Sequence, residues 1–151
     1  MAKKKNKLIS FPSKLKYKKP SKHLSNVVCS KISFKSTVGM FGRYVVQASK
    51  SGFMTRGQIE AVRVALRRPI KHVKNAKVWV LIKVDRIVTK RSAETRMGKG
   101  KGAPSFQIAL IEKGQLLYEI FGPTFFKINR VFKKAFKKLP VPSVLVDLYN
   151  G

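Results

Sequence analysis

A run of alternating glycine and lysine lies at residues 96–102, which read Arg-Met-Gly-Lys-Gly-Lys-Gly. Glycine allows a backbone to approach its partner closely and to adopt dihedral angles that other residues avoid. The lysines between the glycines can then contact phosphate groups on both sides of the backbone, which predicts a nucleic-acid-binding loop. A flexible linker is the alternative interpretation. The candidate binding residues of this loop are Arg96, Met97, Gly98, Lys99, Gly100, Lys101 and Gly102.

Residues that could support catalysis are few and scattered. The loop has neither the Gly-Lys-Ser/Thr ending of a nucleotide-binding loop nor the spacing of a dinucleotide fingerprint. The two histidines, His23 and His72, have no candidate catalytic partner nearby in the sequence. The single cysteine, Cys29, excludes an internal disulfide and a multi-cysteine zinc site. We therefore expect no enzyme, no metal and no cofactor, and we expect Glu60 and Glu119 to offset neighbouring cations.

The overall charge supports a polyanionic partner. The chain holds 34 Lys and Arg against 6 Asp and Glu, which gives a formal net charge of +28 over 151 residues. So many like charges repel one another in a folded body unless a polyanion neutralises them. A phosphate backbone does so, because each cation that meets a phosphate releases a condensed counterion. Apolar residues make up 44% of the chain, which predicts a folded core within one domain.

The first 36 residues predict a basic RNA-binding arm ahead of a single globular domain at 37–151. No acidic residue precedes Glu60, whereas that stretch holds fourteen Lys and Arg. Prolines interrupt the arm, and it lacks a helical period, so we expect an extended segment that orders on RNA. A terminus without a role is the alternative. Nine Lys and no Arg among residues 1–22 argue against a cleaved mitochondrial presequence. An aromatic ring among cations can stack on a base, which makes candidates of Lys14, Lys16, Tyr17, Lys18 and Lys19.

The first predicted helix begins after Gly52. Thr55 and Gln58 have the spacing of a capping box, in which the hydroxyl and the side-chain amide each accept a hydrogen bond from a free backbone N–H at the helix start. Apolar residues then recur at helical spacing until Pro69, which we expect to end the helix. The predicted core positions are Ile59, Val62 and Leu66, and a separate arginine face is formed by Arg56, Arg63 and Arg67.

The remaining elements predict an α+β fold. Residues 77–88 are rich in Val and Ile and include Trp79, so we expect one largely buried strand with Trp79 in the core. Residues 105–112 and 115–121 resemble the two strands of a hairpin around Lys113-Gly114. A second helix should start at Pro123 and stop at Pro140, followed by a short strand at 144–148. We expect a two-layer sandwich of a mainly antiparallel sheet with two helices, plus the extended basic N-terminal arm.

The loop at 96–102 is similar, without interruption, to the signature of the large-subunit ribosomal protein L sixteen family. The resemblance covers about residues 12–146 of the sequence. The further similar segments are Gly52 and Thr55 with 58–61, the strand-like residues 77–80, the hairpin residues 109–111 and 117–119, the helix end at 138–140, the basic and aromatic residues 16–19 and, as in organellar members, residues 41–44.

The resemblance implies a structural constituent of the large ribosomal subunit that binds its RNA near the aminoacyl-tRNA site. It also implies a role in late subunit assembly and in positioning tRNA. The implied partners are large-subunit RNA, tRNA at the aminoacyl site with tRNA at the peptidyl site as a further candidate, and neighbouring large-subunit proteins. We expect neither membrane contact nor a homo-oligomer. By position, RNA contacts would come from Arg96, Lys99 and Lys101 in the loop, from Arg56, Arg63 and Arg67 in the helix, and from Arg43 at the segment shared with organellar members.

Several residues depart from the family pattern. Leu81 replaces a cation, Lys83 and Val84 replace an aromatic residue and a proline, Phe53 replaces a frequent arginine, and Gln107 replaces an aromatic residue after the loop. These departures indicate a divergent organellar ribosome, and we expect a mitochondrial one. A free organellar nucleic-acid-binding protein is the alternative function, and an RNA-modifying enzyme is a third.

Overall fold

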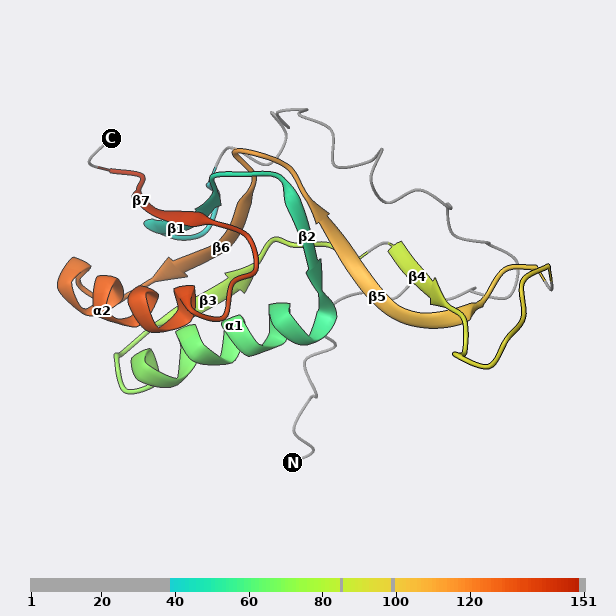
Figure 1. Cartoon of the computed structure of the whole chain (residues 1–151). Coiled ribbons are helices and arrows are strands. Elements are labelled where there is room, and N and C mark those ends of the chain that lie inside the picture. The colour runs from blue at the N-terminus through green and yellow to red at the C-terminus, as the bar shows by residue number, and fades with distance from the viewer. Residues whose placement is uncertain (1–38, 85, 99, 150–151) are drawn as a thin grey trace.

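The computed structural model describes residues 39–84, 86–98 and 100–149 (Figure 1). The predicted arm at 1–36, with Lys14, Lys16, Tyr17, Lys18 and Lys19, lies outside the described residues, as do Cys29 and Lys99. The α+β class is confirmed, because strands and helices alternate irregularly along the described chain. The elements are β1 (Tyr44–Ala48), β2 (Gly52–Thr55), α1 (Arg56–Ile70), β3 (Lys77–Val80), β4 (Arg86–Lys90), β5 (Ala103–Ile111), β6 (Leu116–Phe121), α2 (Phe125–Phe136) and β7 (Ser143–Asp147).

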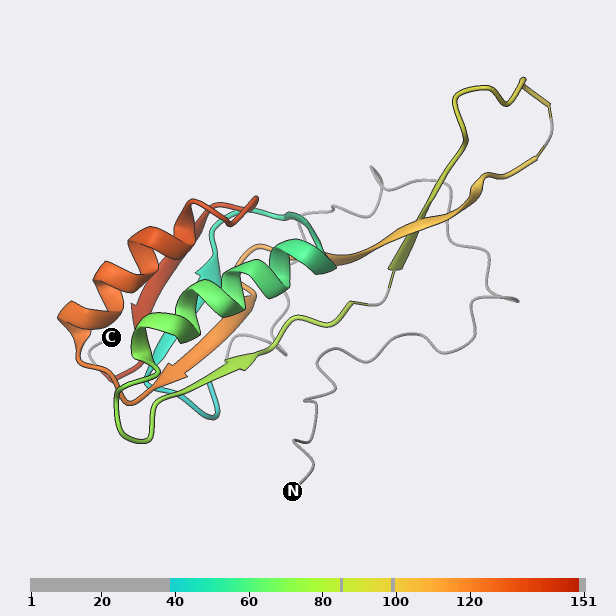
Figure 2. The same ribbon diagram turned by 90° about the horizontal axis from the view of Figure 1, so that it is seen from below.

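The strands form two antiparallel sheets where one was expected. The larger sheet has the order β3-β6-β1-β7, and the smaller has the order β2-β5-β4. Both helices lie on the same side of the four-stranded sheet (Figures 1 and 2). On that side Tyr44, Val46 and Ala48 of β1 alternate into the core, which they share with the buried faces of α1 and α2. The core of the body therefore sits between this sheet and the two helices.

Local signals define the start of α1, but its end differs from the prediction. The capping box is confirmed: Thr55 Oγ1 accepts from the Gln58 N–H at 3.3 Å, and Gln58 Oε1 accepts from the Thr55 N–H at 2.8 Å. Ile59, Val62 and Leu66 are fully buried, as predicted. Pro69 does not end the helix, which continues to Ile70. Proline removes only one hydrogen bond in the last turn, and the burial of Ile70 (1% exposed) holds that turn against the core.

The single strand predicted at 77–88 is wrong. Its first part is β3, which pairs with β6, whereas its last part belongs to β4, which pairs with β5 in the other sheet. Ile82 and Val84 in the connecting residues 81–84 are buried at 4% and 2% exposure. They extend the apolar pattern across the link, and an apolar run without a period does not reveal where one strand ends.

The hairpin predicted around Lys113-Gly114 is also wrong, although a tight turn is present there. The Gln115 N–H donates to the Glu112 carbonyl at 3.2 Å, yet β5 pairs with β2 and β4 while β6 pairs with β1 and β3. The turn is instead held by β1, since the Gly114 N–H donates to the Ala48 carbonyl at 2.8 Å. The chain therefore passes from one sheet to the other at this turn.

The second helix is shorter than predicted at both ends. Thr124 is its N-cap, so Pro123 precedes the helix, and the residues after Phe136 close in turns well before Pro140. Ile128, Val131 and Ala135 form its buried stripe. The final strand is confirmed as β7, one residue earlier than the predicted 144–148.

Trp79 does not lie in the core. It is half-buried on the opposite face of the four-stranded sheet, where its ring stacks on Phe41 with centroids 5.8 Å apart. Its neighbour across the strands is Glu119, which is 1% exposed. The Glu119 carboxylate accepts from the N–H groups of Met40, Phe41 and Gly42 at 3.2, 2.6 and 3.0 Å. The expectation that Glu119 offsets cations is therefore wrong, because it anchors the segment 39–43 across the sheet.

Candidate nucleic-acid interface

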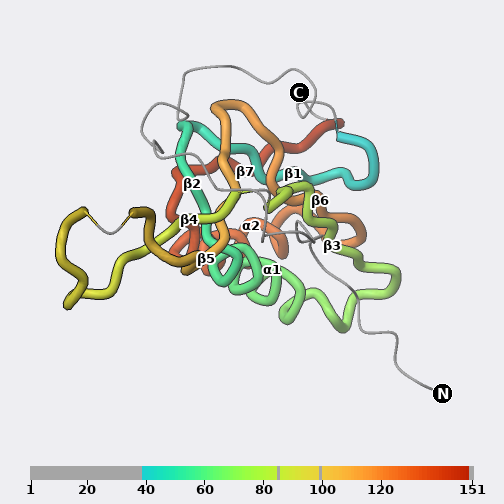
Figure 3. The backbone as a smooth tube through the Cα atoms, turned by 90° about the vertical axis from the view of Figure 1, so that its right-hand side faces the viewer, coloured from blue at the N-terminus to red at the C-terminus, as the bar shows by residue number. Residues whose placement is uncertain are grey.

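A two-stranded ribbon carries the predicted binding loop away from the body. β4 and β5 pair from Arg86 opposite Ile108 to Lys90 opposite Ala103, whereas β2 pairs only with β5 residues 108–111. The outer part of β5 therefore pairs with β4 but not with β2. Figures 1 and 2 show the ribbon leaving the body, and Figure 3 shows its loop standing clear of the helices. Every described residue from 91 to 98, with Gly100 and Lys101, is exposed.

Glycine geometry and one arginine shape the loop. Gly98 and Gly100 have φ angles of 95° and 80°, which other residues rarely adopt. A Cβ atom at Gly102 would lie 2.6 Å from the Lys90 carbonyl oxygen, so glycine is needed for the two ribbon ends to meet. The Arg91 guanidinium donates to the Gly100 carbonyl across the mouth of the loop. These contacts fix the backbone at the base of the loop, and Arg96, Met97, Gly98, Gly100 and Lys101 are exposed beyond it.

The loop presents cations and one apolar side chain to solvent. Arg96 and Lys101 are exposed, and Met97 is 95% exposed. Lys90 and Arg91, at the end of β4, are also exposed at the loop base. Sequence reasoning missed these last two, because only the strand pairing brings them opposite residues 102–103.

The three arginines predicted on α1 differ in their surroundings. Arg56 and Arg67 are exposed at the two ends of the row. Arg63 follows Ile59 by four residues, so it borders the buried face, and its side chain is only 16% exposed. Its guanidinium donates to both oxygens of Glu60, at 2.9 and 2.5 Å.

The ion pair on α1 perturbs the titration of both partners. Hydrogen bonding to Arg63, and more weakly the charge of Arg56, lowers the pKa of Glu60. The same hydrogen bond raises the pKa of Arg63. The expectation that Glu60 offsets neighbouring arginines is confirmed. The helix therefore presents exposed Arg56 and Arg67 beside a guanidinium that is already matched by a carboxylate.

A hollow joins the start of α1 to the ribbon. A pocket of about 590 Å³ lies between them, and a second of about 450 Å³ lies at the loop base. Both are bordered by Pro104 and Ser105, so they adjoin. The larger is lined by Arg56 and by Phe106, whose side chain is 43% exposed. Phe106 was not predicted, because a strand aromatic gives no sequence signal of which side it faces.

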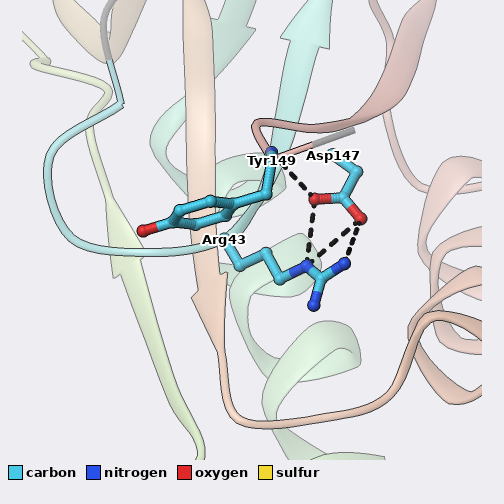
Figure 4. Close-up of polar contacts among 3 residues, drawn as sticks. All are labelled: Arg43, Asp147 and Tyr149. Atoms are coloured by element: carbon cyan, nitrogen blue, oxygen red, sulfur yellow. Dashed lines mark hydrogen bonds and ion pairs between the residues drawn. The ribbon is translucent and has the colours of Figure 1, made fainter. Parts of the chain in front are cut away.

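Arg43 is committed to a contact within the body. Its Nε donates to both carboxylate oxygens of Asp147 at 3.0 and 3.2 Å, and its Nη2 donates to one at 3.0 Å (Figure 4). The guanidinium also lies 5.3 and 5.9 Å from the ring centroids of Tyr44 and Tyr149. The hydrogen bond between Arg43 and Asp147 raises the pKa of Arg43 and lowers that of Asp147. Arg43 thus ties the start of β1 to the end of β7, and the structure does not bring it to the ribbon.

The described residues offer no metal centre of the usual kind. No group of three or more His, Cys, Asp or Glu side chains comes together within 39–84, 86–98 and 100–149. In the same part of the chain, no helix has the length and apolar character needed to cross a membrane. His72 is exposed in the link after α1.

The sequence matches a known protein family over most of its length. Residues 12–146 match the family described as ribosomal protein L16p/L10e. The matched region includes the body, the ribbon and its loop.

Proposed function

The chain belongs to the ribosomal protein L16p/L10e family, and from this premise we propose that its ribbon and α1 bind large-subunit ribosomal RNA beside the aminoacyl-tRNA site. At the coarser level it is a structural protein of the large ribosomal subunit. Members of such a family are typically not enzymes.

The observation that carries the proposal is the ribbon with its exposed loop. The loop lies away from the hydrophobic core and consists mainly of glycines and cations, so it buries little apolar surface against the body and adds little to its stability. Phosphate groups on several sides would match Arg96, Lys99 and Lys101, while Gly98, Gly100 and Gly102 let the RNA backbone approach. The Arg91 contact to the Gly100 carbonyl pre-forms the loop, so less entropy is lost on binding. We therefore propose that the loop at the tip of the ribbon makes the main contact with the RNA.

The exposed arginines of α1 form the second part of the proposed interface. Arg56 lines the hollow at the ribbon base, and Arg67 lies further along the helix. Arginine suits this position because its planar fork can make two parallel hydrogen bonds to a phosphate. Arg63 would contribute mainly by keeping Glu60 neutralised, since a bare carboxylate here would repel the RNA.

The proposed place of the loop beside the aminoacyl-tRNA site implies a role in translation. A loop that fixes the conformation of ribosomal RNA there would act late in subunit assembly. It would also help to position the tRNA at the aminoacyl site, and the tRNA at the peptidyl site is a further candidate partner. Neighbouring large-subunit proteins complete the surroundings. The departures at Leu81, Lys83 and Gln107 support an organellar ribosome, and we propose a mitochondrial one.

Sedimentation tests the proposed function directly. The tagged full chain is expected to comigrate with large subunits and intact ribosomes on a sucrose gradient after a moderate-salt wash. A protein held only by counterion release leaves RNA as salt rises. Recovery in the light fractions, with large subunits intact, would favour a free nucleic-acid-binding protein instead.

A double variant tests the loop. Replacing Lys99 and Lys101 by glutamate is expected to impair subunit maturation or tRNA accommodation while the melting temperature of the isolated chain stays unchanged. The matched control replaces Lys50 and Lys113, exposed cations at turns of the body, with the same change in net charge. Normal growth on ribosomes that carry only the loop variant would contradict the assignment. An equal defect in the control would show that total charge matters rather than the loop.

A further inference from the structure

One exposed face of α2 is not part of the interface proposed for the ribbon and α1. This outer face is formed by Phe126, Arg130, Lys133 and Lys137. These residues are spaced by four, three and four positions, so they share one side of the helix. Each lies two positions from a residue of the buried stripe, and two residues turn an α-helix by about 200°. All four are exposed, so this face points directly away from the core.

The cations on this face have no carboxylate nearby in the sequence. No Asp or Glu occurs between Glu119 and Asp147. Glu119 is used within the body by the segment 39–43, and Asp147 is used by Arg43. The flanks of the helix add further exposed cations, namely Lys127, Lys134 and Lys138. This end of the molecule is therefore strongly positive over several helical turns.

An exposed aromatic ring lies at the start of the same face. Phe126 is 88% exposed. Phe125 meets it edge-on, with centroids 6.4 Å apart, and is in turn 6.2 Å from the Tyr44 ring. A single exposed apolar side chain is ordinary on a protein surface. A phenyl ring that is propped from one side and lies in line with three cations offers a stacking surface next to phosphate-binding groups.

We propose that the outer face of α2 is a second RNA-binding surface, on which one base of a large-subunit RNA strand stacks on Phe126 while Arg130, Lys133 and Lys137 contact the following phosphates. The inference rests on the proposed function and extends it. The ribbon loop and α2 lie at opposite ends of the molecule (Figures 1 and 2). The chain thus joins two separate segments of the RNA.

RNA fits this face better than an acidic protein does. The ligand must supply a flat apolar surface at one end and repeated negative charges along about three helical turns, each about 5.4 Å long. A nucleic-acid strand carries both features in every nucleotide. An acidic peptide would match the cations alone and would leave Phe126 exposed.

Photo-crosslinking in large subunits decides the identity of the partner. Benzoylphenylalanine replaces Phe126 in one full-length chain and Met97 of the loop in another. We expect both to form RNA adducts, mapped by primer extension to different segments. Adducts to protein only at position 126, or none there while position 97 reacts with RNA, would overturn the inference and leave the proposed function intact. Failure at both positions, with the chain absent from large subunits, would overturn both.

Binding of the full chain to transcribed large-subunit RNA, at about 0.2 M salt, tests the stacking. Loss of one stacked base is expected to weaken binding of Phe126→Leu by about 5- to 150-fold, whereas Phe126→Tyr should bind as the parent does. Because Phe126 is exposed, neither change should alter the melting temperature. Equal affinity of the leucine variant and the parent would refute the stacking contact.

Discussion

Replacing Glu119 by glutamine is expected to release the segment 39–43 from the four-stranded sheet. The carboxylate is 1% exposed and accepts three backbone N–H groups, two on Oε2 and one on Oε1. Glutamine has the same size, so no cavity forms. It carries no charge, however, and one of its two polar atoms can only donate. The substitution therefore isolates the electrostatic part of the anchor.

The magnitude follows from these three bonds. With its amide oxygen in the place of Oε2, glutamine keeps the bonds from Phe41 and Gly42 but turns an NH₂ group toward the Met40 N–H. A hydrogen bond to a charged group contributes about 1.5–3 kcal/mol and a neutral one about 1 kcal/mol, so two bonds weaken and a third is lost. Met40 is 78% exposed, so water can satisfy part of that loss. We expect the free energy of unfolding to fall by about 2–6 kcal/mol.

The single tryptophan gives the assay a local signal. Trp79 stacks on Phe41, so lifting the segment 39–43 should expose its indole and shift its emission to longer wavelength before global unfolding. Denaturant titration of the full chain measures the free energy. Glu94→Gln, in the exposed loop, is the matched control and should change neither signal. An unchanged unfolding midpoint together with unchanged emission for Glu119→Gln would refute the anchoring role.

Three further predictions concern stability. Thr55→Ala removes the side-chain cap of α1 and should lower the free energy of unfolding by about 0.5–2 kcal/mol, whereas Thr124→Ala, at an N-cap without such a bond, should have a smaller effect; equal losses in denaturant titrations would contradict this. Trp79→Ala should cost less than the roughly 3–5 kcal/mol of a fully buried aromatic, because Trp79 is half-buried, and a larger loss would show tighter packing. Burial raises the pKa of Tyr118 above its ordinary value of about 10. The contribution of the neutral Tyr118 to the free energy of unfolding is therefore complete below about pH 10 and is lost as the pH rises above that value. Tyr118→Phe should flatten the alkaline part of a stability–pH curve, and an unchanged slope would assign the decline to other groups.

Features of the fold encoded locally could be predicted from the sequence. The capping box at Thr55, the buried stripe of α1 and the glycine-lysine loop each depend on residues within a few positions of one another. The strand pairing could not be predicted. Residues 112–115, with a turn at Lys113-Gly114, join β5 to β6. These two strands nevertheless lie in different sheets, because β5 pairs with β2 and β4 while β6 pairs with β1 and β3. Two strands that follow each other in the sequence therefore need not pair in the fold, and the sequence alone does not show which strands pair.

In the candidate site, too, features that depend on nearby residues could be predicted and features that depend on distant residues could not. The residues of the loop could be named from the glycine-lysine pattern, and of those that the structure describes Arg96, Met97, Gly98, Gly100 and Lys101 are exposed, whereas Gly102 packs against Lys90. The surroundings of the arginines could be predicted only in part. Arg63 lies three positions from Glu60 on α1, so this local pair could be predicted, whereas Arg43 is paired with Asp147, 104 positions away. Long-range pairings depend on which groups the fold brings together, and composition alone counts every arginine as equally available.

The central position of β1 has a consequence for biosynthesis. Its partners on both sides, β6 and β7, come much later in the chain, and the contact from Arg43 spans 104 residues. At about 5–20 residues per second, β7 is translated roughly 5–20 s after β1. Until then at least one edge of β1 lacks the strand that it pairs with. The four-stranded sheet therefore cannot close around β1 until β7 has been made, because β7 supplies the partner for one of its two edges.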